Sequence, residues 1–350
     1  MTNDIARSYW KILQTAVWLI GVTMVILLVW QPDIGLHAFW NVLIPVAPAL
    51  LVVAPGVWRN ICPLASTALY ARKYSMASDR RRLSPAANNR LLLAGVALLL
   101  LIIPLRHVIF DRSGPATALL LVLITGAALL LCLRYEWKSS WCSGLCPVHP
   151  VEKLYGTKPL VSPMNAHCLN CERCVEVCAD STRGMEPLTG ANGSKARGLA
   201  GLLMFGLFPG YIYGWFQVPD YMLPDGWQHT SAAYGHAIIP GLLTFAAYLI
   251  ARYIVPEPRH ATLNGVFAAS AVACYYWFRL PALFGFGAFP PPDGMLVDLT
   301  ASIPTWWVVV SRVLTTSFFF WWMPWRSKIK RPWAERPEFS ATQRDCERAS

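Results

Sequence analysis

The stretch around which the chain is organised begins as WCSGLCPVHPVEKLYG, residues 141–156, and ends as HCLNCERCVEVCAD, residues 167–180. The first part places Cys142 and Cys146 in a C-x₃-C-P motif, and the second carries cysteines at the spacing C-x₂-C-x₂-C-x₃-C. The second set is Cys168, Cys171, Cys174 and Cys178. In bacterial ferredoxins this spacing brings three thiolates to one cubane, while the fourth cysteine begins a helix that points away. The motif therefore predicts a [4Fe-4S] cluster.

Disulfide bonds and a zinc site are the alternatives for these cysteines. Cysteines this close in sequence do not easily reach disulfide geometry, and the flanking charges place the motif on the reducing, cytosolic side of a membrane. Zinc sites usually draw their ligands from two separated pairs, whereas this motif is one continuous run. Both alternatives are weaker than the iron–sulfur interpretation.

The composition is that of an integral membrane protein. Of the 350 residues, 55% are hydrophobic and 14% are charged, whereas soluble domains carry about 25% charged residues. The apolar run that starts at Trp10 is longer than the roughly 7–15 residues of a signal-peptide core and has no small-x-small cleavage site, so we interpret it as a retained first span. Eight apolar runs reach the length of about 20 residues that a transmembrane helix needs. They lie at 10–30, 38–57, 91–110, 116–134, 198–217, 235–254, 264–283 and 304–323.

Basic residues predict the orientation. Twenty-six of the 30 Lys and Arg residues fall in segments on one side of the eight predicted spans, including both termini, the 59–90 loop and the cysteine motif. The positive-inside rule places these segments in the cytoplasm. The basic residues bracket apolar runs and form no aromatic-interleaved patch, so the expected partner of the net charge of +11 is the anionic lipid leaflet and not nucleic acid.

The C-x₃-C-P motif has an echo earlier in the chain. Residues 58–70 read WRNICPLASTALY, and Cys62-Pro63 follows the second span as Cys146-Pro147 follows the fourth. We interpret these as two copies of a Cys-Pro elbow, each followed by a short helix along the membrane face, with proline in the first turn. In the first copy Trp58 stands where the second has Cys142.

The number of clusters stays open. The ferredoxin-type motif supplies four thiolates and the elbows supply three more, Cys62, Cys142 and Cys146, whereas two all-cysteine cubanes need about eight. The elbow thiols could hold part of a second cluster, or they could be free or redox-active beside a single one. The remaining cysteines, Cys132, Cys274 and Cys346, match no ligand spacing.

Histidines and one arginine are further candidates. His149 and His167 flank the cysteine motif and could be ligands or proton partners, although an exposed loop position is the more usual one. His37, His107, His229 and His236 lie on the opposite side of the predicted membrane and could form a quinol, haem or metal site. Arg312 falls inside the last span, where a charge is costly and is expected to face inward or lie near the interface.

These features divide the chain into four parts. Residues 1–134 form a four-span membrane half, 135–197 a cytoplasmic segment with the cysteine motifs, 198–325 a second four-span half, and 326–350 a basic, loosely ordered tail. Prolines within the spans predict kinks that neighbouring helices or water must compensate. The predicted fold class is all-α, with about eight transmembrane helices and a ferredoxin-like loop between spans four and five.

The spans, elbows and cysteine motif of residues 10–180 resemble the NosR/NapH/CcoG group of polyferredoxin-like membrane proteins. Cys142, Cys146 and Pro147 match that group's elbow motif in full, Cys62 and Pro63 match it in half, and the four ferredoxin-type cysteines match its cluster motif. The resemblance implies a bacterial inner-membrane protein that carries electrons between the quinone pool or a cytoplasmic donor and a respiratory or periplasmic partner. It leaves open whether the chain is a quinol dehydrogenase subunit.

Two functions follow as expectations. The first is iron–sulfur electron transfer in the membrane. The second is an assembly or structural subunit of a larger redox complex, in which the cluster braces the fold or senses redox state. The sequence contains no phosphate-binding glycine loop, dinucleotide fingerprint or nucleophile–base arrangement.

Overall fold

The computed structural model describes residues 3–74, 83–135, 138–168, 178, 180–181, 194–222, 224–290, 292–326 and 331–335. In this part of the chain the regular elements are all helices, and an isolated parallel bridge joins Met164 to Glu335. The predicted all-α class is therefore confirmed for the described residues. The ferredoxin-like loop, of which Cys168, Cys178, Asp180 and Ser181 are described, remains a prediction.

Within the described residues, seven helical stretches are long and apolar enough to cross a membrane, and they coincide with the first seven predicted spans. They are Ser8–Trp30, Pro32–Val53, Pro85–Phe110, Gly114–Arg134, Lys195–Trp215, Asp225–Ile254 and Glu257–Leu283. The eighth prediction falls on α14 (Trp306–Phe320), which is not among these seven stretches. The helical path continues through the π-helix η7 (Trp321–Trp325).

Five of the seven stretches are interrupted helices. The first is α1 (Asn3–Trp30) and the fourth is α7 (Gly114–Arg134), both continuous. The second comprises α2 (Pro32–Leu36), η1 (His37–Leu43) and α3 (Ile44–Val53), the third α6 (Pro85–Leu105) and η2 (Arg106–Phe110), and the fifth α10 (Lys195–Leu202), η4 (Leu203–Leu207) and α11 (Phe208–Trp215). The sixth comprises η5 (Asp225–His229) and α12 (Thr230–Ile254), and the seventh η6 (Glu257–Arg259) and α13 (His260–Leu283). The π-helical segments η1, η2, η4 and η7 each contain a proline or lie within two residues of one, because proline lacks the N–H that the α-helical ladder needs.

Tyrosine hydroxyls from the second half repair breaks in the first half. The Tyr276 hydroxyl of α13 donates to the carbonyl of Pro45 at 2.6 Å and accepts from the amide of Ala49 at 2.9 Å, so it bridges an opened turn of α3. The Tyr211 hydroxyl of α11 donates at 2.5 Å to the carbonyl of Leu100, which lies four residues before a proline of α6. The predicted compensation by neighbouring helices is thus found at both places.

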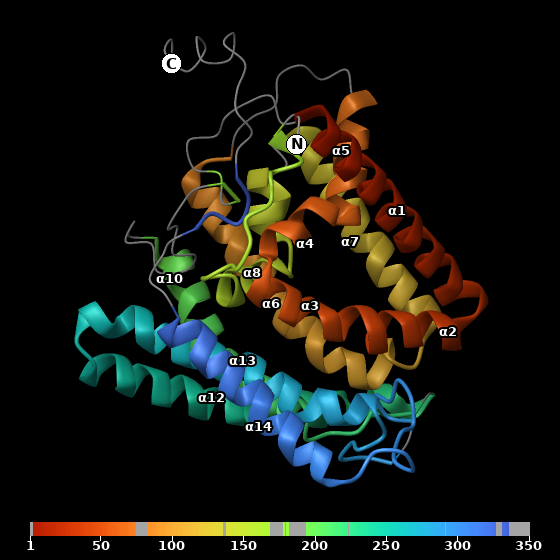
Figure 1. Cartoon of the computed structure of the whole chain (residues 1–350), viewed down its shortest axis with the longest axis vertical. Coiled ribbons are helices and arrows are strands. Elements are labelled where there is room, and N and C mark those ends of the chain that lie inside the picture. Colours follow the sequence, from red (N-terminus) through yellow and green to blue (C-terminus); the bar gives the residue numbers. More distant parts are fainter. Residues whose placement is uncertain are drawn as a thin grey trace.

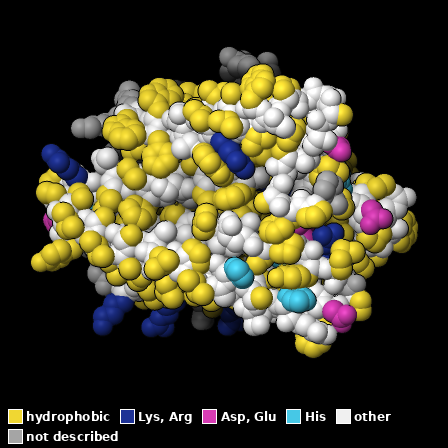
Figure 2. All heavy atoms as spheres, turned by 90° about the horizontal axis from the view of Figure 1, so that it is seen from below, with side chains coloured by type: hydrophobic (Ala, Val, Ile, Leu, Met, Phe, Trp, Pro, Cys, Tyr) yellow, Lys and Arg dark blue, Asp and Glu magenta, His cyan; other side chains and the backbone are white. Residues whose placement is uncertain are grey.

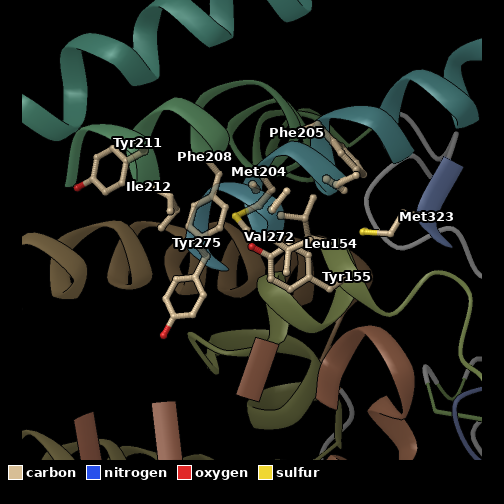
Figure 3. Packing of buried hydrophobic residues seen from close by; sticks show 14 of the residues in the cluster. Leu154, Tyr155, Met204, Phe205, Phe208, Tyr211, Ile212, Val272, Tyr275 and Met323 are labelled. Carbon is tan, nitrogen blue, oxygen red and sulfur yellow. The ribbon is translucent and has the colours of Figure 1, made fainter. Parts of the chain in front are cut away.

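One hydrophobic core joins the two membrane halves. Figure 1 shows α12, α13 and α14 along one side of the molecule, α1, α3 and α7 along the other, and α6 and α8 (His149–Tyr155) between them. Figure 3 shows Leu154 and Tyr155 of α8 beside Met204, Phe208 and Val272 of the second half. The short helix of the second elbow is therefore buried within the protein, and its predicted course along the membrane face stays a prediction.

The two elbows differ in detail. Cys62 ends α4 (Pro55–Ile61), and Pro63 begins α5 (Pro63–Tyr74), as predicted. Cys146 follows the π-helix η3 (Lys138–Leu145), but Pro147 lies in a turn before α8, and Pro150 occupies the first turn of that helix. The proline in the first turn of this helix is therefore Pro150, three residues after the predicted Pro147. Pro147 instead lies in the turn at residues 147–148.

The outer surface is apolar along the spans. Figure 2 shows hydrophobic side chains over most of one face, with charged groups near its edges. Large apolar side chains such as Ile12, Leu130, Leu243 and Val309 are exposed on α1, α7, α12 and α14. This surface is the kind that lipid tails cover, which agrees with a membrane protein.

We expect Tyr276→Phe to lower the free energy of unfolding by about 1–3 kcal/mol, because the Ala49 amide and the Pro45 carbonyl lose a partner in an apolar interior. The measurement is denaturant or thermal unfolding of the purified chain in detergent. Tyr253→Phe is the matched control, since Tyr253 is 93% exposed and should change nothing measurable. Equal stability of the two variants would contradict the bridging role.

Candidate functional site

A buried ion cluster is centred on Arg59 of α4. Its guanidinium lies 2.6 Å from the Glu152 carboxylate of α8 and 3.3 Å from that of Asp180, and all three side chains are at least nine-tenths buried. The Trp333 ring covers the guanidinium at 5.2 Å. Although burial opposes the charge, Glu152 and Asp180 outweigh it and raise the pKa of Arg59. One arginine thus joins four segments that are distant in sequence.

The three elbow thiols lie beside this cluster. Cys62, Cys142 and Cys146 pack against one small apolar group that includes Trp141, and all three interact electrostatically with Arg59. Gly95 of α6 allows this approach, because a Cβ there would lie 3.1–3.3 Å from carbonyl oxygens of residues 144–146. The structure therefore brings thiols of both elbows to one apolar cluster.

Burial governs the protonation of these thiols. It raises the pKa of Cys62 and of Cys142, and burial with Glu152 and Cys62 nearby raises that of Cys146 to about 12. In a site of this polarity a thiolate needs a compensating cation, such as a guanidinium or a bound metal.

Both ends of the ferredoxin-type motif are attached to α4. Before the motif, His167 donates from Nε2 to the carbonyl of Arg59 at 2.8 Å, and Cys168 is the next residue. After the motif, the Asp180 carboxylate reaches the Arg59 guanidinium, and Cys178 lies two residues earlier. Cys171 and Cys174 lie outside the described residues.

The segment that precedes the motif is held by two asparagines. Asn60, fully buried next to Arg59, donates to the carbonyl of Met164 at 2.8 Å and accepts from the amide of Ala166 at 3.1 Å. Asn165 donates to the Ser181 hydroxyl at 3.0 Å, which connects the two flanks of the motif. This hydrogen bond links the chain before the motif to the chain after it.

No disulfide bond joins the described cysteines. No group of three or more His, Cys, Asp or Glu side chains among the described residues is arranged to hold a single metal ion. The predicted cluster itself is not tested by this finding, because two of its four expected ligands lie outside the described residues.

His149 and His167 are buried, so the expectation of exposed loop histidines was wrong. His149 Nδ1 lies 2.5 Å from Arg59 Nη2 and 3.1 Å from the Glu152 carboxylate. Burial, and then the nearby Arg59 charge, hold the pKa of His149 well below its ordinary range. Both histidines belong to the ion cluster, His149 by its side chain and His167 through the Arg59 carbonyl.

No described contact joins the four histidines predicted on the opposite side of the membrane from the cysteine motif. His107 is buried, where Nδ1 meets the Asp220 carboxylate and Nε2 lies 2.9 Å from the carbonyl of Trp215. Among the described contacts, His37 pairs with Asn41 at 3.3 Å, His229 stacks on Tyr221 at 4.2 Å, and His236 is exposed on α12. Within the described structure no hydrogen bond or ring contact joins two of these four side chains, and a shared quinol, haem or metal site stays a prediction.

His107 instead belongs to a second buried group of charges at the far end of α6. Arg106 pairs with Asp111 at 3.0 Å and lies between the rings of Trp40 and Trp215. Burial and the neighbouring Asp111 raise the pKa of Asp220 well above its usual range, while Arg106 overcomes burial and lowers that of Asp111. Asp220 is therefore the member of this carboxyl pair that holds its proton more tightly.

Several residues of the site were missed from the sequence. Arg59 was counted only as a topology-setting charge, and Glu152, Asp180 and Asn60 were not singled out. The sequence feature that could have identified Arg59 and Asn60 was their position, directly before the first elbow at a predicted membrane exit. Trp333 and Ala334 fall in the tail predicted to be loosely ordered, yet both are buried. That prediction was wrong for residues 331–335, and the other residues after 326 lie outside the described part.

Comparison with known proteins gave no match to a protein family, a curated protein or a solved structure.

We expect Arg59→Met to destabilise the fold by about 3–5 kcal/mol, because Glu152 and Asp180 are left buried without their cation. Adding Glu152→Gln to this variant should recover part of the loss. Unfolding of the single and double variants in detergent measures the coupling. Arg90→Met, at an exposed position of α6, is the control. A single variant as stable as the wild type would show that Arg59 does not hold the segments together.

Asp220 should make stability pH-dependent. Its raised pKa means that the folded state binds a proton more tightly than the unfolded state, so this contribution is complete below about pH 4 and is lost as the pH rises through the folded-state pKa. Asp220→Asn should remove that loss. The expected result is a melting temperature that falls less steeply between acidic and mildly alkaline pH than that of the wild type. Parallel curves for the two proteins would contradict it.

Proposed function

We propose that the chain is a membrane-bound iron–sulfur electron-transfer protein, similar to the NosR/NapH/CcoG group, with its cluster on the cytoplasmic side of a bacterial inner membrane. The observation that supports this best is the attachment of both flanks of the ferredoxin-type motif to Arg59, beside three thiols from the two elbows. The five described thiols of the elbows and the motif thus belong to one region of the fold: Cys62, Cys142, Cys146, Cys168 and Cys178.

The donor set fits a [4Fe-4S] cluster. Cys168 and Cys178 lie at the two ends of the motif and form no disulfide bond, and soft thiolates are the ligands that such clusters take. When bound, the cluster supplies one-electron transfer. The surrounding residues would set its environment: Arg59 provides a buried positive charge beside anionic ligands, and Asn60 and Asn165 fix the backbone before the first ligand.

The proposal gives the elbow thiols one of two alternative roles. They could complete a second cluster, or they could line the route between the motif and the membrane interior. Electrons would pass between a cytoplasmic donor or the quinone pool and a respiratory or periplasmic partner.

The test is iron and sulfide analysis with redox-poised EPR of the anaerobically purified chain. We expect about four iron and four sulfide per cluster and broad absorption near 400 nm. Cys168→Ser should remove most of one cluster, whereas Cys274→Ser, at a cysteine of α13 away from the motif, should leave the content unchanged. Fewer than about three iron per wild-type chain would overturn the proposal. Loss of the cluster without loss of electron transfer in the intact complex would favour a structural or assembly role.

A further inference from the structure

A cavity of about 50 Å³ lies at the end of the molecule that carries η2, between α11, α13 and the loop after α13. This exceeds the roughly 10–15 Å³ that one water molecule needs. Three arginines line it, Arg106, Arg279 and Arg312, and two carboxyl groups, Asp220 and Asp293. Ala288 on its rim is exposed, so the cavity lies near the surface.

Arg279 is the unusual group of this cavity. Its side chain is buried, and it donates only to neutral oxygens in the described structure: the carbonyl of Trp40 at 2.7 Å and the amide oxygen of Asn41 at 2.5 Å. Among the described residues no carboxylate lies within ion-pair distance of it, and its Nε has no hydrogen-bond partner. Asp111 and Asp220 act on this buried cation only from beyond ion-pair distance, so a ligand that supplies negative charge at the guanidinium would stabilise it.

The other charged groups around the cavity do not neutralise the positive charge of Arg279. Arg106 is paired with Asp111. The Asp220 carboxyl group contacts His107, and burial and Asp111 raise its pKa. Arg312 bonds the carbonyl of Trp277 at 3.0 Å and covers its ring, again without a carboxylate among the described residues. With three arginines and two aspartates, the lining carries one formal net positive charge, which a monovalent anion would balance.

The donors also have the chemistry that an oxyanion needs. The Nε atoms of Arg106 and Arg279 and the indole Nε1 of Trp215 are buried donors without partners, and all three residues line the cavity. Gly294, at φ +66°, brings the loop onto Arg279, since a Cβ there would lie 2.3 Å from Nη1. Guanidinium and indole N–H groups bind oxyanions by charge-assisted hydrogen bonds.

We propose that this cavity binds a small monovalent oxyanion, held by Arg279 with Arg312 at the rim. The site is independent of the cysteine motif and goes beyond the proposed electron-transfer function.

The experiment is isothermal titration of the purified full-length chain in detergent with sodium nitrate and, separately, sodium formate, with ionic strength held constant by a bulky sulfonate buffer. We expect saturable one-site binding that weakens about tenfold or more in Arg279→Gln, as the loss of a charge-assisted hydrogen bond implies. Arg90→Gln is the matched control and should bind as the wild type does.

A second variant keeps the proposal testable if Arg279→Gln does not fold. Asp293→Asn removes one of the two carboxyl groups from the cavity lining, so binding should become several-fold tighter. The proposal is overturned if neither anion gives saturable binding, if Arg279→Gln binds as tightly as the wild type, or if Asp293→Asn has no effect. Saturable binding of a neutral hydroquinone that is insensitive to Arg279, without anion binding, would also overturn it.

Discussion

The Arg59 guanidinium is the interaction on which the organisation of the cysteine-bearing end depends. It is buried with Glu152 and Asp180 and is covered by Trp333, so a single side chain connects α4, α8, the end of the cysteine motif and the segment 331–335. A buried ion pair stabilises little relative to apolar packing, but it specifies which segments meet, because each charge pays heavily for a missing partner. The elbow thiols lie where they do because this cluster fixes the elements that carry them.

A second constraint operates inside the membrane region. Prolines interrupt the helices of the first half, and each break frees a backbone group that lipid cannot satisfy. The hydroxyls of Tyr276 and Tyr211 fill two such places, and the Arg279 guanidinium bonds the carbonyl of Trp40. Side chains of the second half therefore complete the backbone of the first.

A row of aromatic rings also runs along the core. Successive ring centroids lie 4.4–5.7 Å apart from Tyr276 through Tyr275, Phe216 and Trp215 to His107.

Much of the fold could be predicted, because hydrocarbon demands long apolar runs that are visible in the sequence. Seven spans lie where they were predicted, and the proximity of Cys62 to Cys142 and Cys146 agrees with the repeated Cys-Pro elbow. The ion cluster could not be predicted, because the charged partners of Arg59 lie more than 90 residues from it along the chain and carry no common spacing. His149 illustrates the difficulty: its position beside a cysteine motif indicated an exposed ligand, but α8 turns inward and buries it.

The amino-acid sequence by itself determined that the chain is helical, apolar enough for a membrane and furnished with a ferredoxin-type cysteine run, since these depend on composition and local spacing. Only the tertiary structure decided which charges are paired and which are not. Arg59 has two carboxylates, whereas Arg279 has none within ion-pair distance among the described residues. The two arginines look alike in sequence, because the free energy of a buried charge depends on neighbours that only the folded chain provides.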